Sequence, residues 1–257
     1  MAPAHTRPDP APPPPYTSPA RHQERVVPPL LRTRTRPVSS AATQVVPLAG
    51  PLGTLFPDGV VRRGTVVHVV PGSPNTGGTT SLAIALLAAV SGAGGWTAMI
   101  GVSDPGVAAI ADAGVDLGRL VLVPDPGARW AEVTAAALGG TAAVVVRPPA
   151  SGSPRAARRL AAITRERRSI LVVATPSRWA EPPDIRLVIR HSTWTGLDGG
   201  HGHLRSHCCD VLAEGRRAAS RPVTTTLWFA GEPQPMSGAE RPAPQPTAGT
   251  GRQPGNR

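Results

Sequence analysis

The sequence contains no lysine, because all 27 of its basic residues are arginine. No ammonium side chain is therefore present anywhere in the chain to contact a phosphate. Arginine can take over such a contact, since its planar guanidinium group binds phosphate through two parallel hydrogen bonds. A general preference for arginine codons would give the same composition without a functional cause. The absence of lysine thus limits the chemistry of any phosphate site without proving that one exists.

Cysteine is scarce as well. The two cysteines, Cys208 and Cys209, are adjacent. Neighbouring cysteines seldom form a disulfide, and they lack the spacing of a zinc site. Long apolar runs are also missing: the longest, Leu82–Val90, is far shorter than the roughly 20 residues that cross a bilayer. The N-terminus has no apolar signal segment. These absences predict a cytoplasmic protein without membrane association.

Both ends of the sequence have few large apolar residues. Residues 1–45 are rich in Pro, Arg, Ser and Thr, and residues 231–257 in Pro, Gly, Gln and Thr. Neither end can bury enough apolar surface to offset the conformational entropy lost on folding. We therefore expect two disordered tails around one core domain at residues 46–230. The net charge of +11 favours a polyanionic partner, although arginines in a disordered tail can also serve solvation alone.

Between the two ends, β-branched segments alternate with Ala- and Leu-rich helical patterns. The expected strands are 65–70, 96–102, 119–124, 142–146 and 169–175, and the expected helices are 79–90, 105–114, 130–138 and 154–167. This alternation predicts an α/β fold with a mostly parallel sheet flanked by helices. Further strands are expected at 185–190, 207–214 and 223–229. No helices separate them, which predicts an antiparallel extension at one edge of the sheet.

The stretch "VVPGSPNTGGTTSLAIALL" has the layout of a phosphate-binding loop: an apolar strand, a glycine-rich turn and an apolar helix. Gly72, Gly77 and Thr79 match the pattern G-x-x-x-x-G-K-[ST], but Gly78 replaces the lysine. In an intact loop, backbone N–H groups cradle the phosphates, the lysine reaches the β- and γ-phosphates, and the hydroxyl holds magnesium. We expect this loop, including Thr80, to keep its shape as a degenerate nucleotide site without its chemistry.

A second departure occurs where such a site needs an acidic residue for magnesium, at the end of a later apolar strand. The strand "AAVVV" is followed directly by Arg147. A cation there would repel a metal ion, or would serve as a surrogate for the lysine if a nucleotide binds. Two departures in separate parts of the site predict that ATP is not hydrolysed efficiently. We expect no cofactor and no metal, and leave weak ATP binding open.

The helical segment 154–167 carries four arginines on one arc, opposite an apolar arc. These are Arg155, Arg158, Arg159 and Arg165. They form either a solvated outer face of the helix or a surface that contacts nucleic-acid phosphates.

Histidines and tryptophans add weaker candidates. The segment 191–209 combines histidines with both cysteines, but its spacing matches no zinc pattern. Trp130 and Trp179 are expected in the core. Trp194 is expected to be exposed, and near Arg190 and Arg205 it could stack on a base.

The order of these pieces resembles the RecA-type recombinase core, and more closely the actinobacterial ImuA-like proteins of SOS mutagenesis. The segment "LGTLFPDGVVRRG" looks like the entry into the first core strand of that family, and "GSPNTGGTT" stands at its phosphate loop. The most specific similarity is "MIGVSDPGVAAIADAGVDLGRLVLVPDPG". By this resemblance Gly72, Gly77 and Thr79 carry over as nucleotide-loop positions, whereas Gly78 and Arg147 do not. The catalytic glutamate of the family would fall near Ser103 or Asp104.

The resemblance implies a non-catalytic RecA-like accessory protein in DNA repair and damage tolerance, which bridges translesion polymerase components, or a recombinase filament, and DNA. We expect the DNA contact to be weak and independent of sequence. Residues 224–257, with Trp228 and Phe229, are the expected contact for a polymerase component. One alternative is a DNA-dependent ATPase with an unusual nucleotide site, and another is a plain DNA-binding protein.

Overall fold

The computed structural model of the protein describes residues 44–150, 152–176, 179–196, 205–216 and 220–230. The tails expected at 1–45 and 231–257 lie outside these ranges, apart from Gln44 and Val45. Val45 already begins a strand, one residue before the expected start of the core domain.

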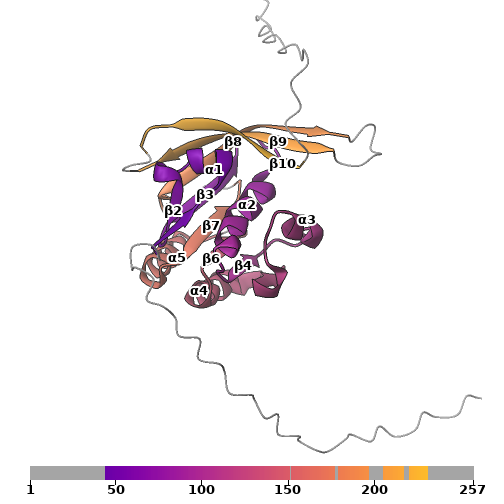
Figure 1. The fold of residues 1–257 in the computed structure, drawn as a ribbon. Coiled ribbons are helices and arrows are strands. Elements are labelled where there is room, and N and C mark those ends of the chain that lie inside the picture. Colours follow the sequence, from indigo (N-terminus) through magenta and orange to yellow (C-terminus); the bar gives the residue numbers. More distant parts are fainter. Residues whose placement is uncertain (1–43, 151, 177–178, 197–204, 217–219, 231–257) are drawn as a thin grey trace, which may run out of the picture. The chain divides into compact units, whose positions relative to one another are not determined.

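An eight-stranded sheet forms the centre of the described structure (Figure 1). Its strands are β3 (Val66–Pro71), β4 (Thr97–Ile100), β5 (Leu120–Val123), β6 (Ala143–Val146), β7 (Ile170–Ala174), β8 (Ile185–Thr195), β9 (Ser206–Gly215) and β10 (Val223–Ala230). Their spatial order is β10-β9-β8-β3-β7-β6-β4-β5. The six strands from β8 to β5 are parallel, and β9 and β10 add an antiparallel edge. The expected α/β class and antiparallel extension are confirmed.

Helices lie against both faces of the sheet because the parallel strands are apolar on both sides. The helices are α1 (Gly50–Thr54), α2 (Thr79–Gly92), α3 (Val107–Asp112), α4 (Trp130–Gly140) and α5 (Pro154–Arg167). One core cluster joins α2 and α3 to alternate strand residues such as Val67 and Val145. The other joins α4 and α5 to the intervening residues, such as Val66 and Val144. The two-residue period of the strands therefore separates two cores.

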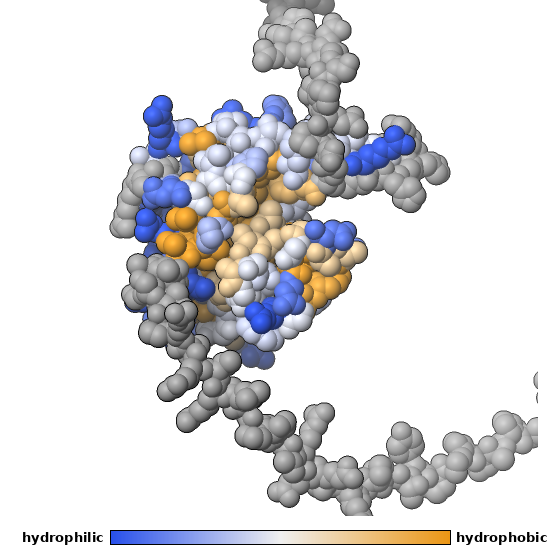
Figure 2. Space-filling model, in the orientation of Figure 1, coloured by the Kyte–Doolittle hydropathy of each residue, from blue (hydrophilic) through white to orange (hydrophobic). Residues whose placement is uncertain are grey.

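Helix α2 has no polar face. Its side away from the sheet consists of small residues, including Ala85, Ala88 and Ala89, which are half-buried. The space-filling view shows hydrophobic residues across the middle of this side of the molecule and hydrophilic residues around them (Figure 2). A helix that is apolar all round is typical of a buried position, and α2 accordingly supplies much of one core.

Three elements were not predicted. Strands β1 (Val45–Pro47) and β2 (Val60–Arg62) form a short antiparallel pair, and α1 lies between them. Short 3₁₀ turns also lie at Pro57–Gly59, Leu117–Arg119 and Gly127–Arg129. Leu55 and Phe56, which follow α1, are 3% exposed and pack into the α2 core. Tertiary packing therefore stabilises segments that are too short to show a period in the sequence.

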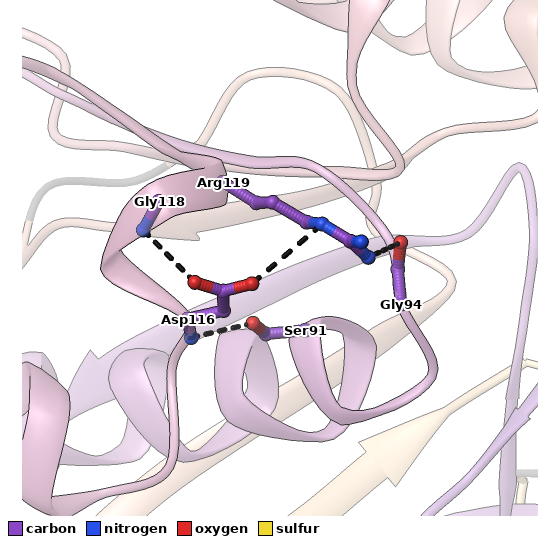
Figure 3. A network of polar contacts seen from close by, with 5 residues as sticks. All are labelled: Ser91, Gly94, Asp116, Gly118 and Arg119. Carbon is purple, nitrogen blue, oxygen red and sulfur yellow. Dashed lines mark hydrogen bonds and ion pairs between the residues drawn. The ribbon is translucent and has the colours of Figure 1, made fainter. Parts of the chain in front are cut away.

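A polar network ties the end of α2 to the edge strand β5 (Figure 3). The Ser91 hydroxyl accepts a hydrogen bond from the Asp116 backbone N–H at 2.8 Å. The Asp116 carboxylate accepts from the Gly118 N–H at 2.9 Å and lies 3.6 Å from Arg119, whose guanidinium donates to the Gly94 carbonyl. These contacts hold the segment "GVDLGRLVLV" beside α2, the helix that follows the glycine-rich loop.

Within the described residues, none of the helices combines the length and the apolar character that crossing a membrane requires.

Candidate functional site

The glycine-rich loop lies at the carboxyl edge of the sheet, between the end of β3 at Pro71 and the start of α2 at Thr79. After β3 the chain crosses one face toward β4, and after β6 it crosses the other face in the opposite direction, toward β7. The carboxyl ends of these strands therefore bound a topological switch point, where open α/β sheets bind their ligands. The fold places the loop where a ligand site is expected.

A backbone hydrogen bond joins the glycine-rich loop to β8. The N–H of Gly72 donates to the Ile189 carbonyl at 2.7 Å. A Cβ on residue 72 would lie 2.7 Å from the same oxygen, so the approach requires glycine. Within the loop, the hydroxyls of Ser73 and Thr76 are 2.8 Å apart. The Gly72 N–H is thus already used, and it is not free to hold a phosphate.

The position of the missing lysine is occupied by side chains of β9. Gly78 has a φ of 96° and forms the N-cap of α2. A Cβ built on Gly78 would lie 2.5 Å from the Cys209 Sγ and 3.4 Å from the His207 Nε2. A side chain at residue 78 therefore meets both a strained backbone and a filled space. Glycine at position 78, in place of the lysine, therefore leaves room for the β9 side chains that pack against the loop.

His207 is the centre of a cluster that closes this space, and we call it the His207 cluster. Its members are Ser81, Ser192, Trp194, His207, Cys209 and Phe229. The imidazole Nδ1 lies 3.4 Å from the Ser81 hydroxyl, and Nε2 lies 3.2 Å from the Ser192 hydroxyl and 3.3 Å from the Cys209 Sγ. The Trp194 ring stacks on the imidazole with centroids 3.5 Å apart and 11° between the planes.

Burial determines the protonation states of the titratable side chains in the His207 cluster. Desolvation lowers the pKa of His207 to about 4 and raises the pKa of Cys209. Both side chains are therefore neutral near pH 7. A neutral imidazole cannot supply the positive charge of the missing lysine. A neutral thiol at 1% exposure is also a poor nucleophile, because the thiolate is the reactive form. His207 and Cys209 therefore pack against each other as neutral side chains.

The sequence suggested Arg147 as a surrogate cation for the glycine-rich loop. In the structure, its guanidinium group lies at the start of α2. Its Nη2 donates to the Thr80 Oγ1 at 2.8 Å. Thr80 follows Thr79, the residue at the magnesium hydroxyl position of the pattern, so Arg147 brings a positive charge to this end of α2. The remaining N–H donors of Arg147 give it the chemistry of a surrogate cation for an anion at the loop.

The carboxyl edge also contains a small cavity beside Arg147, at the start of α5. Pro148, Ser153, Thr175 and Trp179 are among the residues that line it, and its volume is about 20 Å³. A volume of this size holds roughly one water molecule. This cavity is too small for a nucleotide.

Other expected residues lie apart from the loop. Asp104 is exposed and lies two residues before Gly106, the N-cap of α3. Trp130 and Trp179 are 7% exposed and belong to the α4–α5 core, as predicted. The helix α5 exposes four of its arginines on the side opposite its buried residues, namely Arg155, Arg158, Arg159 and Arg165.

The histidine-rich segment divides between two environments. His191 is exposed, His207 is buried, and His201 and His203 lie outside the described residues. In the part of the chain that the structure describes, no group of three or more His, Cys, Asp and Glu side chains could hold a metal ion. Trp194 is 44% exposed, as expected, but one face of its ring is covered by His207.

The comparisons with known proteins connect the chain to a mycobacterial relative. Residues 54–181 match the family model of the MT3502 N-terminal domain. The chain is also 32% identical, over 127 residues, to the Uncharacterized protein Rv3395c of Mycobacterium tuberculosis (strain ATCC 25618 / H37Rv). This alignment covers 47% of the chain and 62% of the length of the relative. The family match includes the loop, Arg147 and α5, but it ends before the β8 and β9 residues of the His207 cluster.

Proposed function

We propose that the protein is a RecA-like accessory protein in DNA damage tolerance that works without nucleotide hydrolysis. The observation that carries this proposal is the occupation of the phosphate loop by the His207 cluster. The side chains of His207 and Cys209 lie where the side chain of residue 78 would project. A filled loop, a lost lysine and a guanidinium at the magnesium position each weaken catalysis, and they act together.

The RecA-like part of the proposal has two supports besides the sequence resemblance. The unit of β3, glycine-rich loop and α2 stands at the switch point of a mostly parallel sheet. The three strands after β7 follow without helices in the described residues and end in the antiparallel edge that the sequence pattern predicts. The damage-tolerance role and its partners come from the resemblance to ImuA-like proteins alone.

Nucleotide binding and turnover on the purified full chain test the non-catalytic part. We expect no phosphate release above background, with or without single-stranded or duplex DNA, because no lysine and no magnesium carboxylate are present at the loop. Thr79→Ala provides the control, since Thr79 occupies the hydroxyl position of the pattern. Turnover that is stimulated by DNA and lost in Thr79→Ala would establish the DNA-dependent ATPase instead.

Binding to defined partners tests the damage-tolerance part. We expect the full chain to bind a purified translesion polymerase component, or a recombinase filament on single-stranded DNA, and a chain ending at Gly231 to bind more weakly. Residues 231–257 lie outside the described structure. The preceding strand β10 places Leu227 and Phe229 toward the α2 core, so Trp228 lies half-buried on the opposite face.

Trp228→Thr in the full chain is the matched control for this measurement, because it removes the aromatic ring and keeps a good strand-forming residue. Weaker binding by the truncated chain alone assigns the contact to the tail, and weaker binding by Trp228→Thr assigns it to the sheet edge. Equal binding by all three chains would exclude the C-terminal part as the contact. Absence of binding to both partners would contradict the mutagenesis role.

A further inference from the structure

Four of the five arginines of α5 have no acidic partner among the described residues. Arg62, Arg119, Arg129, Arg167 and Arg186 each lie within 3.6 Å of a carboxylate. Among the described residues, none of the carboxylates lies within ion-pair distance of Arg155, Arg158, Arg159 or Arg165. Glu166, the one acidic residue within α5, pairs with Arg167. Four unneutralised guanidinium groups thus share one exposed helix face.

Helix stability does not explain the first three of these arginines. Arg155, Arg158 and Arg159 lie in the first two turns of α5, and the first turn contains no acidic residue. The N-terminal end of a helix carries partial positive charge, so cations there are unfavourable. Arg155 also has like-charged neighbours three and four residues further along the helix, which repel it. By contrast, Arg165 near the C-terminal end is favourably placed for the helix dipole.

The opposite side of α5 is fixed by packing. Ala157, Leu160, Ala161 and Thr164 are buried against the sheet and α4. The helix cannot rotate to bring its arginines toward other groups without exposing these residues. The arginine face therefore has a fixed direction toward solvent. From Arg155 to Arg165 it extends about 15 Å, since each helical residue rises about 1.5 Å.

We propose that this face binds the phosphate backbone of nucleic acid, with duplex DNA as the partner. Each strand of duplex DNA presents one phosphate per roughly 3.4 Å of helix axis, so a 15 Å face can reach several phosphates. Bound phosphates relieve the repulsion among the arginines, and guanidinium groups match phosphate oxygens through paired hydrogen bonds. The proposal rests on the proposed function for the choice of DNA among polyanions, and it requires no nucleotide at the loop.

Fluorescence anisotropy of a labelled 20-base-pair duplex, titrated with full-length protein at several salt concentrations and without nucleotide, tests the proposal. We expect replacement of Arg155, Arg158, Arg159 and Arg165 by Gln to weaken binding at low salt at least tenfold. The slope of log K against log salt should fall by about 3 to 4 units, at about 0.9 per lost duplex contact. A matching single strand should give a smaller slope and a smaller change.

The matched control replaces four exposed arginines of the antiparallel edge, Arg186, Arg190, Arg205 and Arg216, by Gln. It lowers the net charge by the same amount, so it should weaken binding only slightly and keep the slope. An equal loss in both variants would mean that net charge alone attracts DNA. Loss in the control only would place the contact at Trp194, Arg190 and Arg205. Tighter binding to anionic lipid vesicles than to duplex DNA would assign the face to a membrane surface.

Urea unfolding distinguishes the DNA contact from a structural role of the arginines. Because Arg155 opposes the helix dipole and repels Arg158 and Arg159, the Gln variant should unfold at an unchanged or higher urea concentration. A lower midpoint together with unchanged DNA binding would overturn the proposal. The smaller variant Arg158→Gln with Arg159→Gln should lower the salt slope by about 2 units. Neither measurement uses ATP. The test of the arginine face can therefore be interpreted even if an ATP-binding result contradicts the proposed function.

Discussion

Gly78→Lys should destabilise the protein strongly and should create no ATPase, although it restores the complete phosphate-loop pattern. Two costs add at this position. A non-glycine residue at a φ of 96° costs about 1–2 kcal/mol. Its Cβ would also lie 2.5 Å from the Cys209 Sγ, and overpacking of this kind costs about 1–3 kcal/mol. We therefore expect the free energy of unfolding to fall by about 2–5 kcal/mol.

Gly114→Lys is the matched control for the backbone term. Gly114 has a φ of 92°, and a Cβ there would have no atom within 4 Å. This variant should lose only the conformational part, about 1–2 kcal/mol. The difference between the two variants in urea unfolding then measures the contact with the His207 cluster. Adding Cys209→Ala should reduce the loss from Gly78→Lys and leave the loss from Gly114→Lys unchanged, since contacting residues couple and distant ones add.

Phosphate release by the same variants tests the chemistry. Gly78→Lys still has Arg147 bonded to Thr80, next to the hydroxyl position at Thr79, so a magnesium ion at the loop would lie near a positive charge. A Gly78→Lys protein that is as stable as Gly114→Lys and that hydrolyses ATP with DNA would show that the loop is open. In that case the His207 cluster does not fill the loop, and Arg147 does not oppose magnesium.

Most of the sheet could be predicted because periodicity is local. Segments such as 65–70 and 142–146 are apolar throughout, which indicates strands buried on both faces, and the helix at 154–167 has separate arginine and apolar arcs. The short elements β1, β2 and α1 could not be predicted, because three to five residues show no period. Their formation depends on burying neighbours such as Phe56 in the α2 core.

The loop could be identified from its glycines, but its occupant could not. The reason lies in a bulge of β8 between Ile189 and His191, where the pairing with β9 shifts by one residue. Simple alternation from the buried Ile189 would direct His191 toward the loop. The bulge directs Ser192 and Trp194 there instead, opposite Cys209 and His207. A bulge reverses the faces of every following residue, and the sequence alone gave no sign of its position.

His207 should make the protein lose stability as the pH falls from about 6.5 to about 4. Its pKa is lowered to about 4 in the folded protein, whereas a histidine in the unfolded chain has a pKa near 6.5. Between these values the unfolded state binds more protons, so acid favours unfolding. Above pH 6.5 both states are neutral and the contribution is complete. Integrated over the window, the loss is about 3 kcal/mol.

The surroundings of His207 explain why its protonated form is not stabilised in the folded protein. The imidazole is 2% exposed and is covered by Trp194 and Phe229. Its polar neighbours are the hydroxyls of Ser81 and Ser192 and the neutral thiol of Cys209. Within the described residues it forms no ion pair with a carboxylate. A proton on His207 would therefore place an uncompensated charge inside the cluster that fills the loop.

Urea unfolding at pH 7.5, 6.5, 5.5 and 4.5 on three proteins isolates this effect from the titration of carboxylates. The parent and His191→Gln should both lose stability across the series, because His191 is exposed and lies outside the His207 cluster. His207→Gln should be less stable at pH 7.5, since it disrupts the Trp194 stack, but its stability should depend much less on pH. Identical pH dependence in the parent and His207→Gln would show that His207 is not the group that titrates. A parent that becomes more stable as the pH falls would mean that His207 is charged in the folded protein. The positive charge at the loop would then come from His207 as well as from Arg147.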